Sequence, residues 1–144
     1  MDDDLVAMVE YSDSARVEWY LNEYMSQKSA LEAVNEIPWV TGNTATHSAL
    51  WLVRNLVLTS SHGDRSNVPD VVILITDGGT SDVGMATNEA KLLHSSGTNV
   101  IAIGVGLNVD PTELDSYKSS RSFHVVSYGM LTSITRQVVQ ALCI

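Results

Sequence analysis

Asp70-Val71-Val72-Ile73-Leu74-Ile75-Thr76-Asp77-Gly78-Gly79 is the stretch of sequence on which the fold of this chain depends. Its aliphatic run, Val71 to Ile75, lies between turn signals, which predicts a strand buried on both faces, as in a parallel sheet covered by helices. A buried helix segment is the competing interpretation. The run is too short for a helix and rich in β-branched residues, and Pro69 and Gly78, which mark turns, lie at its ends. Open parallel sheets bind ligands at the carboxyl ends of their strands, so this strand delivers Asp77 to a candidate site.

Length and charge limit the classes of protein to consider. A chain of 144 residues predicts one domain over residues 1–144, with enough residues for a core. The formal net charge of −9 and the lack of a basic stripe argue against nucleic acid and anionic membrane surfaces as partners. No apolar run approaches the length of a membrane span, and the acidic start, Met1 to Asp4, is not a secretory signal. Cys143 is the only cysteine, which leaves open a free thiol or half of a bridge to a residue outside this chain.

Hydrophobic periodicity and turn residues predict alternating strands and helices. A hairpin comes first, and the helix after it has Leu31, Val34 and Ile37 on its predicted buried side and Ser26 or Ser29 as its cap. Strands that alternate with helices imply an α/β fold with a mostly parallel, helix-covered sheet. The predicted strands cover residues 5–11, 15–21, 71–75, 99–104 and 122–126, and the predicted helices cover residues 26–37, 45–58, 80–95, 111–117 and 131–142.

These segments resemble the von Willebrand factor type A domain, the family that includes integrin inserted domains and the A modules of matrix collagens and matrilins. The resemblance implies a three-layer, Rossmann-like sandwich: a mostly parallel central sheet with one antiparallel edge strand, and helices on both faces. It covers nearly the whole chain, and four motifs in the family's order carry it. They are Ile73 to Gly78, Ala90 to Gly106, Thr41 to Thr46, and Val125-Val126 leading to Leu131 and Ile134.

The resemblance also implies a metal-ion-dependent adhesion site. The family holds a divalent cation, usually Mg²⁺, with an Asp-x-Ser-x-Ser motif, a threonine before a helix and an aspartate after the central strand. By position, Thr44 is similar to that threonine and Asp77 to that aspartate. Mg²⁺, Mn²⁺ and Ca²⁺ accept oxygen ligands of this kind, and an acidic side chain of a partner can complete the shell. In extracellular members, a cysteine placed like Cys143 often pairs with one ahead of the first strand.

One departure from the family is large. The chain has no Asp-x-Ser-x-Ser motif, and its hairpin, which begins at Leu5, has no strand and helix before it. We therefore expect an N-terminally truncated domain that lacks the family's first strand, serine loop and first helix, with weak or absent cation binding. That strand would lie beside the Val71 strand, so its loss leaves a gap. Completion by another strand and direct pairing of the Leu5 and Val71 strands are both open.

Each candidate residue also has a structural interpretation. Thr44 is placed to cap the helix that follows it, and Asp77 is placed as a turn residue beside two glycines. We interpret Asp82 as a helix cap and Asp13 as a hairpin turn residue. The four histidines show no zinc spacing, and no nucleophile motif or phosphate loop is present.

Two hypotheses about function follow. The first is a non-enzymatic, extracellular protein-binding module of a matrix or cell-surface protein, which binds a protein ligand, collagen among the candidates, near Thr44 and Asp77. The second is a metal-dead structural remnant that binds through other surfaces or associates with itself through strand edges. A hydrolase or nucleotide-binding enzyme is disfavoured, because no motif of either chemistry is present.

Overall fold

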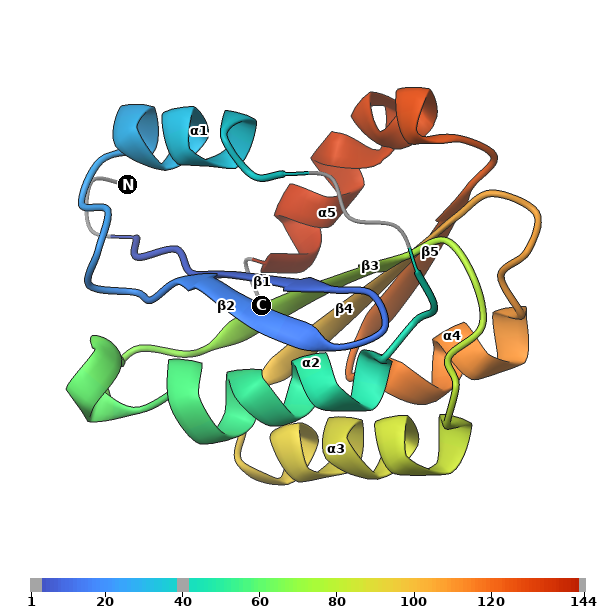
Figure 1. The fold of residues 1–144 in the computed structure, drawn as a ribbon, viewed down its shortest axis with the longest axis horizontal. Coiled ribbons are helices and arrows are strands. Elements are labelled where there is room, and N and C mark those ends of the chain that lie inside the picture. Colours follow the sequence, from blue (N-terminus) through green and yellow to red (C-terminus); the bar gives the residue numbers. More distant parts are fainter. Residues whose placement is uncertain (1–3, 39–41, 143–144) are drawn as a thin grey trace. The chain divides into compact units, whose positions relative to one another are not determined.

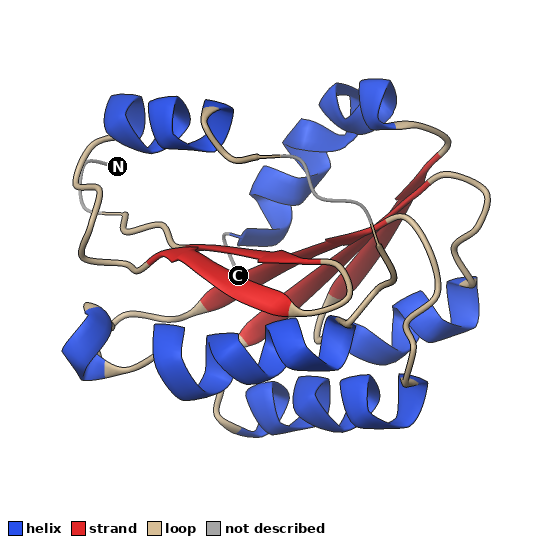
Figure 2. Cartoon of the chain, viewed as in Figure 1, coloured by secondary structure: helices blue, strands red, loops and turns tan. Residues whose placement is uncertain are grey.

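The computed structural model describes residues 4–38 and 42–142, and it shows a mixed α/β chain of helices and strands (Figures 1 and 2). Two compact units make up the chain, Met1–Val68 and Pro69–Ile144. The expectation of one domain over residues 1–144 stays a prediction. Thr41 and Cys143 lie outside the described residues. In the described ranges, no helix has the length and apolar character needed to cross a membrane.

The first unit is built on the predicted hairpin. Strands β1 and β2 pair antiparallel, with Tyr11 opposite Ala15 beside the turn. The Trp19 side chain is buried, and its indole Nε1–H donates to the carbonyl of Val6 at 3.0 Å. Helix α2 packs on both strands and buries Leu50. The elements are β1 (Met8–Tyr11), β2 (Ala15–Trp19), α1 (Gln27–Asn35), α2 (Thr46–Leu52), the π-helical η1 (Val53–Val57) and the 3₁₀ turn η2 (Ser60–His62).

Helix α1 forms as predicted, but its predicted buried side was wrong. Ser26 is the N-cap, and its hydroxyl accepts a hydrogen bond from the Ser29 backbone N–H at 3.2 Å. Leu31 and Val34, however, are 56% and 42% exposed, and the helix has no buried residue. Among the described elements, none packs extensively on α1. Periodicity therefore located an apolar face of this helix, but it could not show whether another element covers that face.

The second unit holds the predicted parallel sheet. Its strands run in the order β3-β4-β5, and the register places Ile73 beside Ile101 and Ile103 beside Phe123. Helices α3 and α4 lie on one face of this sheet and α5 on the other, which confirms the predicted layers (Figure 2). The elements are β3 (Val71–Thr76), α3 (Val83–Ser95), β4 (Asn99–Val105), α4 (Pro111–Tyr117), β5 (Arg121–Val125), the 3₁₀ helix η3 (Tyr128–Ile134) and α5 (Thr135–Leu142).

Strand β3 is buried on one face only, so the prediction of burial on both faces was wrong. Leu74 is 4% exposed, whereas Ile73 and Ile75 are 44% and 43% exposed. Ile73 lies beside Ile101 on the neighbouring strand, and Ile101 belongs to the apolar cluster that α5 covers. That cluster is formed by residues of β4, β5 and α5, so it does not extend over Ile73. In the described ranges β3 has β4 as its ladder partner and β1 has β2. Because the Leu5 and Val71 strands belong to different units, their direct pairing and completion by another strand both stay predictions.

Candidate functional site

Thr44 lies in a loop that the hairpin turn holds in place. The Asp13 carboxylate accepts a hydrogen bond from the Asn43 backbone N–H at 2.8 Å. On the other side of Thr44, the Ala45 N–H donates to the Ser12 carbonyl at 2.8 Å. The loop that enters α2 is therefore attached to the turn between β1 and β2 on both sides of Thr44. Asp13 is a hairpin turn residue, as predicted, and it also anchors this loop.

The half-buried Thr44 does not cap the helix, so the capping interpretation was wrong. Helix α2 begins at Thr46, its N-cap is Ala45, and the Ala45 side chain makes no capping hydrogen bond. The loop also approaches the hairpin closely, because a Cβ atom on Gly42 would lie 2.9 Å from the Asp13 carboxyl carbon. Gly42 has a φ of +154°, which disfavours other residues as well. These contacts fix the backbone on which the Thr44 hydroxyl is carried.

Asp77 follows β3 directly and lies in the second unit. Its side chain is exposed, and its Oδ2 accepts a hydrogen bond from the Tyr128 hydroxyl at 3.1 Å. Tyr128 is the first residue of η3, which follows β5. Partial burial raises the pKa of Tyr128, and the negative charge of Asp77 and the hydrogen bond to it raise that pKa further. The phenol therefore stays protonated at neutral pH and acts as a hydrogen-bond donor to the carboxylate.

A second acidic residue holds the loop after Asp77. The Glu113 side chain, on α4, accepts a hydrogen bond at Oε1 from the Thr80 backbone N–H at 2.8 Å. The same oxygen accepts from the Tyr117 hydroxyl at 2.7 Å, and Tyr117 is buried. The loop that presents Asp77 is thus attached to α4, while Tyr128 holds the carboxylate itself.

Asp82 is the helix cap that the sequence predicts. Its Oδ1 accepts a hydrogen bond from the Met85 backbone N–H at 2.9 Å at the start of α3. That carboxylate oxygen serves the first turn of the helix, which confirms the interpretation of Asp82 as a cap.

The donor atoms of Thr44 and Asp77 fit a small, hard cation. One carboxylate and one hydroxyl are the oxygen ligands that Mg²⁺, Mn²⁺ and Ca²⁺ accept. In the part of the chain that the structure describes, no three His, Cys, Asp or Glu side chains form a group that could hold a metal. Thr44 belongs to the first unit and Asp77 to the second, so their use of one cation remains a prediction.

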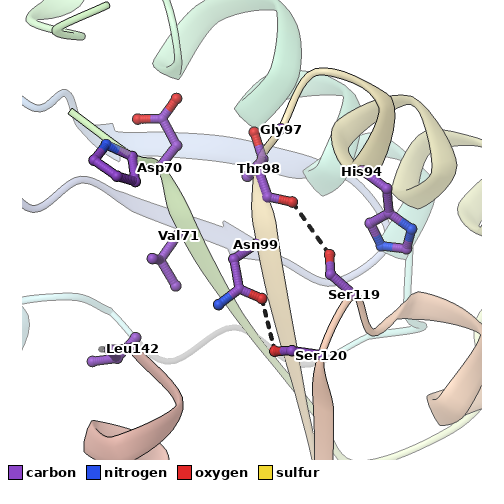
Figure 3. A pocket seen from close by; sticks show the side chains of 10 residues that line it. Asp70, Val71, His94, Gly97, Thr98, Asn99, Ser119, Ser120 and Leu142 are labelled. Carbon is purple, nitrogen blue, oxygen red and sulfur yellow. Dashed lines mark hydrogen bonds between the residues drawn. The ribbon is translucent and has the colours of Figure 1, made fainter. Parts of the chain in front are cut away.

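A pocket of about 390 Å³ lies at the other end of the second unit's sheet (Figure 3). Its polar groups bond to one another: the Ser119 hydroxyl donates to the Thr98 carbonyl at 3.2 Å, and the Ser120 hydroxyl donates to Asn99 Oδ1 at 2.8 Å. These bonds join the start of β4 to the segment before β5. The lining residues are Pro69, Asp70, Val71, His94, Gly97, Thr98, Asn99, Ser119, Ser120 and Leu142.

Comparisons with known proteins agree with the resemblance seen in the sequence. Residues 1–137 match the family model described as von Willebrand factor type A domain. The chain is 30% identical over 142 residues to the collagen alpha-1(XII) chain of Notophthalmus viridescens, covering 96% of this chain and 15% of the relative. It is 30% identical over 145 residues to matrilin-3 of Gallus gallus, covering 96% of this chain and 31% of the relative.

A solved structure is also similar. Proximal thread matrix protein 1 from the mussel byssus, with a zinc-occupied MIDAS motif, has a TM-score of 0.87 and 29% identity. That match covers 98% of this chain and 37% of the mussel chain. The chain thus spans less than a third of each of these two curated relatives and about a third of this structural neighbour.

Proposed function

Because the chain belongs to the von Willebrand factor type A domain family, we propose that it is a non-enzymatic protein-binding module of an extracellular matrix or cell-surface protein. The binding site is the carboxyl end of the sheet, where a divalent cation is held by Thr44 and Asp77. One observation carries the proposal: the exposed Asp77 carboxylate ends a parallel strand, and Tyr128 bonds to only one of its oxygens. The relatives among collagens and matrilins support the matrix setting.

Each residue has a separate role in this proposal. Asp77 supplies the negative charge that attracts the cation, and Thr44 supplies a neutral hydroxyl oxygen. A bound cation supplies a positive centre with open coordination positions, which an acidic side chain of a protein ligand can fill. The zinc-occupied MIDAS motif of the mussel protein supports a divalent ion for a site of this kind. Since the chain lacks the family's serine ligands, we expect weak cation binding.

The proposal can be tested by measuring adhesion to immobilised fibrillar collagen and other matrix proteins in buffered Mg²⁺ and in EDTA. We expect binding in Mg²⁺ that is lost in EDTA and in Asp77→Asn. The matched control is Glu32→Gln, which removes one negative charge from an exposed position of α1. Equal binding by the parent chain in Mg²⁺ and EDTA, together with full binding by Asp77→Asn, would contradict the proposed site.

A cation-independent function, association through the edge of β3, is the second candidate. The Asn99 N–H donates to the Asp70 carbonyl at 3.0 Å, which sets the alternation of backbone groups along β3. It follows that the N–H and C=O groups of Val71 and Ile73 point away from β4. Both side chains are exposed and uncharged, and edge strands of this kind pair readily with other chains. Sedimentation velocity with Ile73→Lys tests this: we expect loss of self-association, whereas a parent chain that stays monomeric at high concentration excludes it.

A further inference from the structure

We propose that Tyr128 is a positioning residue for cation binding, one that orients the Asp77 carboxylate through its hydroxyl group. This inference rests on the proposed function, because it concerns Asp77 as a cation ligand. It adds a residue that neither the sequence motifs nor the family's metal site pointed to.

The geometry leaves one side of the carboxylate available. The Tyr128 hydroxyl donates to Oδ2 of Asp77 at 3.1 Å, and no second side-chain hydrogen bond to this carboxylate is formed within the described ranges. A carboxylate can accept on both oxygens, so Oδ1 remains for a cation while Oδ2 is held. Tyr128 therefore does not need to leave when a cation binds.

The position of Asp77 explains why such a partner matters. The side chain is exposed, and a Cβ atom built on Gly78, the next residue, would meet nothing within 4 Å. A carboxylate in such open surroundings samples several rotamers, and a cation must select one of them. Selecting one rotamer costs conformational entropy. A donor that already holds Oδ2 removes part of this cost before the cation binds.

Tyr128 is itself carried on a segment that the core holds. The Met130 N–H donates to the Ser127 carbonyl at 3.0 Å, which closes the first turn of η3. Farther along, Leu131 and Ile134 pack on the apolar cluster between the sheet and α5. The tyrosine side chain is 58% exposed, so its contact with Asp77 stabilises the fold little and acts mainly on the direction of the carboxylate.

The size of the effect follows from comparable partners. Groups that hydrogen-bond to metal ligands typically change metal affinity by about ten- to 100-fold when they are removed. Asp77 and Tyr128 are both exposed, so water can partly replace the hydroxyl. We therefore expect a smaller loss, about three- to tenfold, in the affinity for Mg²⁺ or Mn²⁺.

The test is calorimetric titration of MgCl₂ and MnCl₂ into the full chain and into Tyr128→Phe, with the cation-free melting temperature of each. The matched control is Tyr24→Phe: the Tyr24 ring packs edge-on against Trp19, a contact that phenylalanine preserves. We expect Tyr128→Phe to bind the cation about three- to tenfold more weakly and to melt within about 1 °C of the parent chain. Tyr24→Phe should bind as the parent does.

The outcomes separate this inference from the proposed function. If the parent chain binds the cation and Tyr128→Phe binds it equally well or more tightly, the positioning role is overturned and the proposed function stands. If the parent chain binds neither Mg²⁺ nor Mn²⁺, both are overturned. Weaker binding by Tyr128→Phe that is accompanied by an equal loss in Tyr24→Phe would also overturn the inference.

Discussion

Replacing Glu113 by alanine should destabilise the second unit and loosen the loop that presents Asp77. The Glu113 carboxylate accepts hydrogen bonds from the Thr80 N–H at 2.8 Å and from the Tyr117 hydroxyl at 2.7 Å. Alanine removes the carboxylate that accepts from both donors, and Tyr117, which carries one of them, is 1% exposed.

The magnitude follows from these two bonds. A hydrogen bond to a charged group contributes about 1.5–3 kcal/mol. Because Glu113 is only half-buried, we take the lower end for each bond, which gives a loss of about 3 kcal/mol in the free energy of unfolding. For a chain of 144 residues, this loss corresponds to a fall of about 10 °C in the melting temperature. Glu113→Gln keeps an oxygen acceptor without the charge, so it should cost about 1 kcal/mol.

Urea unfolding followed by far-ultraviolet circular dichroism, which reports the helices and strands of both units, measures both variants, and thermal unfolding checks the order. The expected order of stability is parent chain, then Glu113→Gln, then Glu113→Ala. A Glu113→Ala variant within about 0.5 kcal/mol of the parent, which is typical of surface substitutions without a structural role, would refute the reasoning. Equal losses in the two variants would show that charge, and not the presence of an acceptor, determines the effect.

Three further predictions concern the second unit. Gly104→Ala should lower the free energy of unfolding, measured in urea, by about 1–3 kcal/mol, because its Cβ would lie 2.8 Å from the Val109 side chain. The control is Gly78→Ala, whose Cβ would meet nothing within 4 Å. Equal losses in the two variants would contradict the packing argument. Asp82→Ala should cost about 0.5–2 kcal/mol through the lost α3 cap, and Asp82→Asn should restore most of it; a neutral Asp82→Ala would contradict the capping role. The Ser122 hydroxyl, which donates at 2.5 Å, lowers the pKa of Asp115, with help from a nearby lysine. Ser122→Ala should therefore raise that pKa in an NMR titration, and the stability that the ionised form gains should be present above the unfolded-state pKa and lost as the pH falls through the folded pKa. An unchanged Asp115 titration would show that the hydroxyl has no effect.

Local signals predicted the ends of α3 and α4 well, whereas α5 begins at Thr135 and not at Leu131, because the 3₁₀ helix η3 comes before it. The predicted cap Asp82 begins α3, which ends at Ser95 as predicted, and α4 covers the predicted residues 111–117. Gly97, with a φ of +89°, follows the end of α3, and Asp110 caps α4, which has Pro111 as its first residue. These residues satisfy or terminate the backbone hydrogen bonds at helix ends, and they are adjacent in sequence to the helices that they cap. They can therefore be identified from the sequence alone. Burial was predicted less well, because it depends on which other elements lie nearby. The exposed faces of α1 and β3 show this, since their apolar residues follow the expected pattern but no described element covers them fully.

In the candidate site too, local sequence predicted one residue but not the residues that contact it through the fold. Asp77 could be placed at a sheet edge from sequence, because an apolar run that ends in an acidic turn fixes its position on the strand. Its two supporting residues could not be found this way. Tyr128 lies 51 residues from Asp77, and Glu113 lies 33 residues from Thr80, so only the folded sheet brings them together. From the sequence, Glu113 in the first turn of α4 is expected only to interact favourably with the helix dipole. Nothing in the neighbouring sequence indicates that it also binds the loop that contains Thr80.

The most direct test of cation binding at Asp77 is thermal unfolding of the full chain over a series of Mg²⁺ and Mn²⁺ concentrations, with Asp77→Ala measured in parallel. A ligand that binds only the folded state raises the melting temperature by mass action. We predict a rise with cation concentration in the parent chain and none in Asp77→Ala. A cooperative transition that stays at one temperature throughout the series, or an equal rise in both proteins, would contradict a cation site at Asp77.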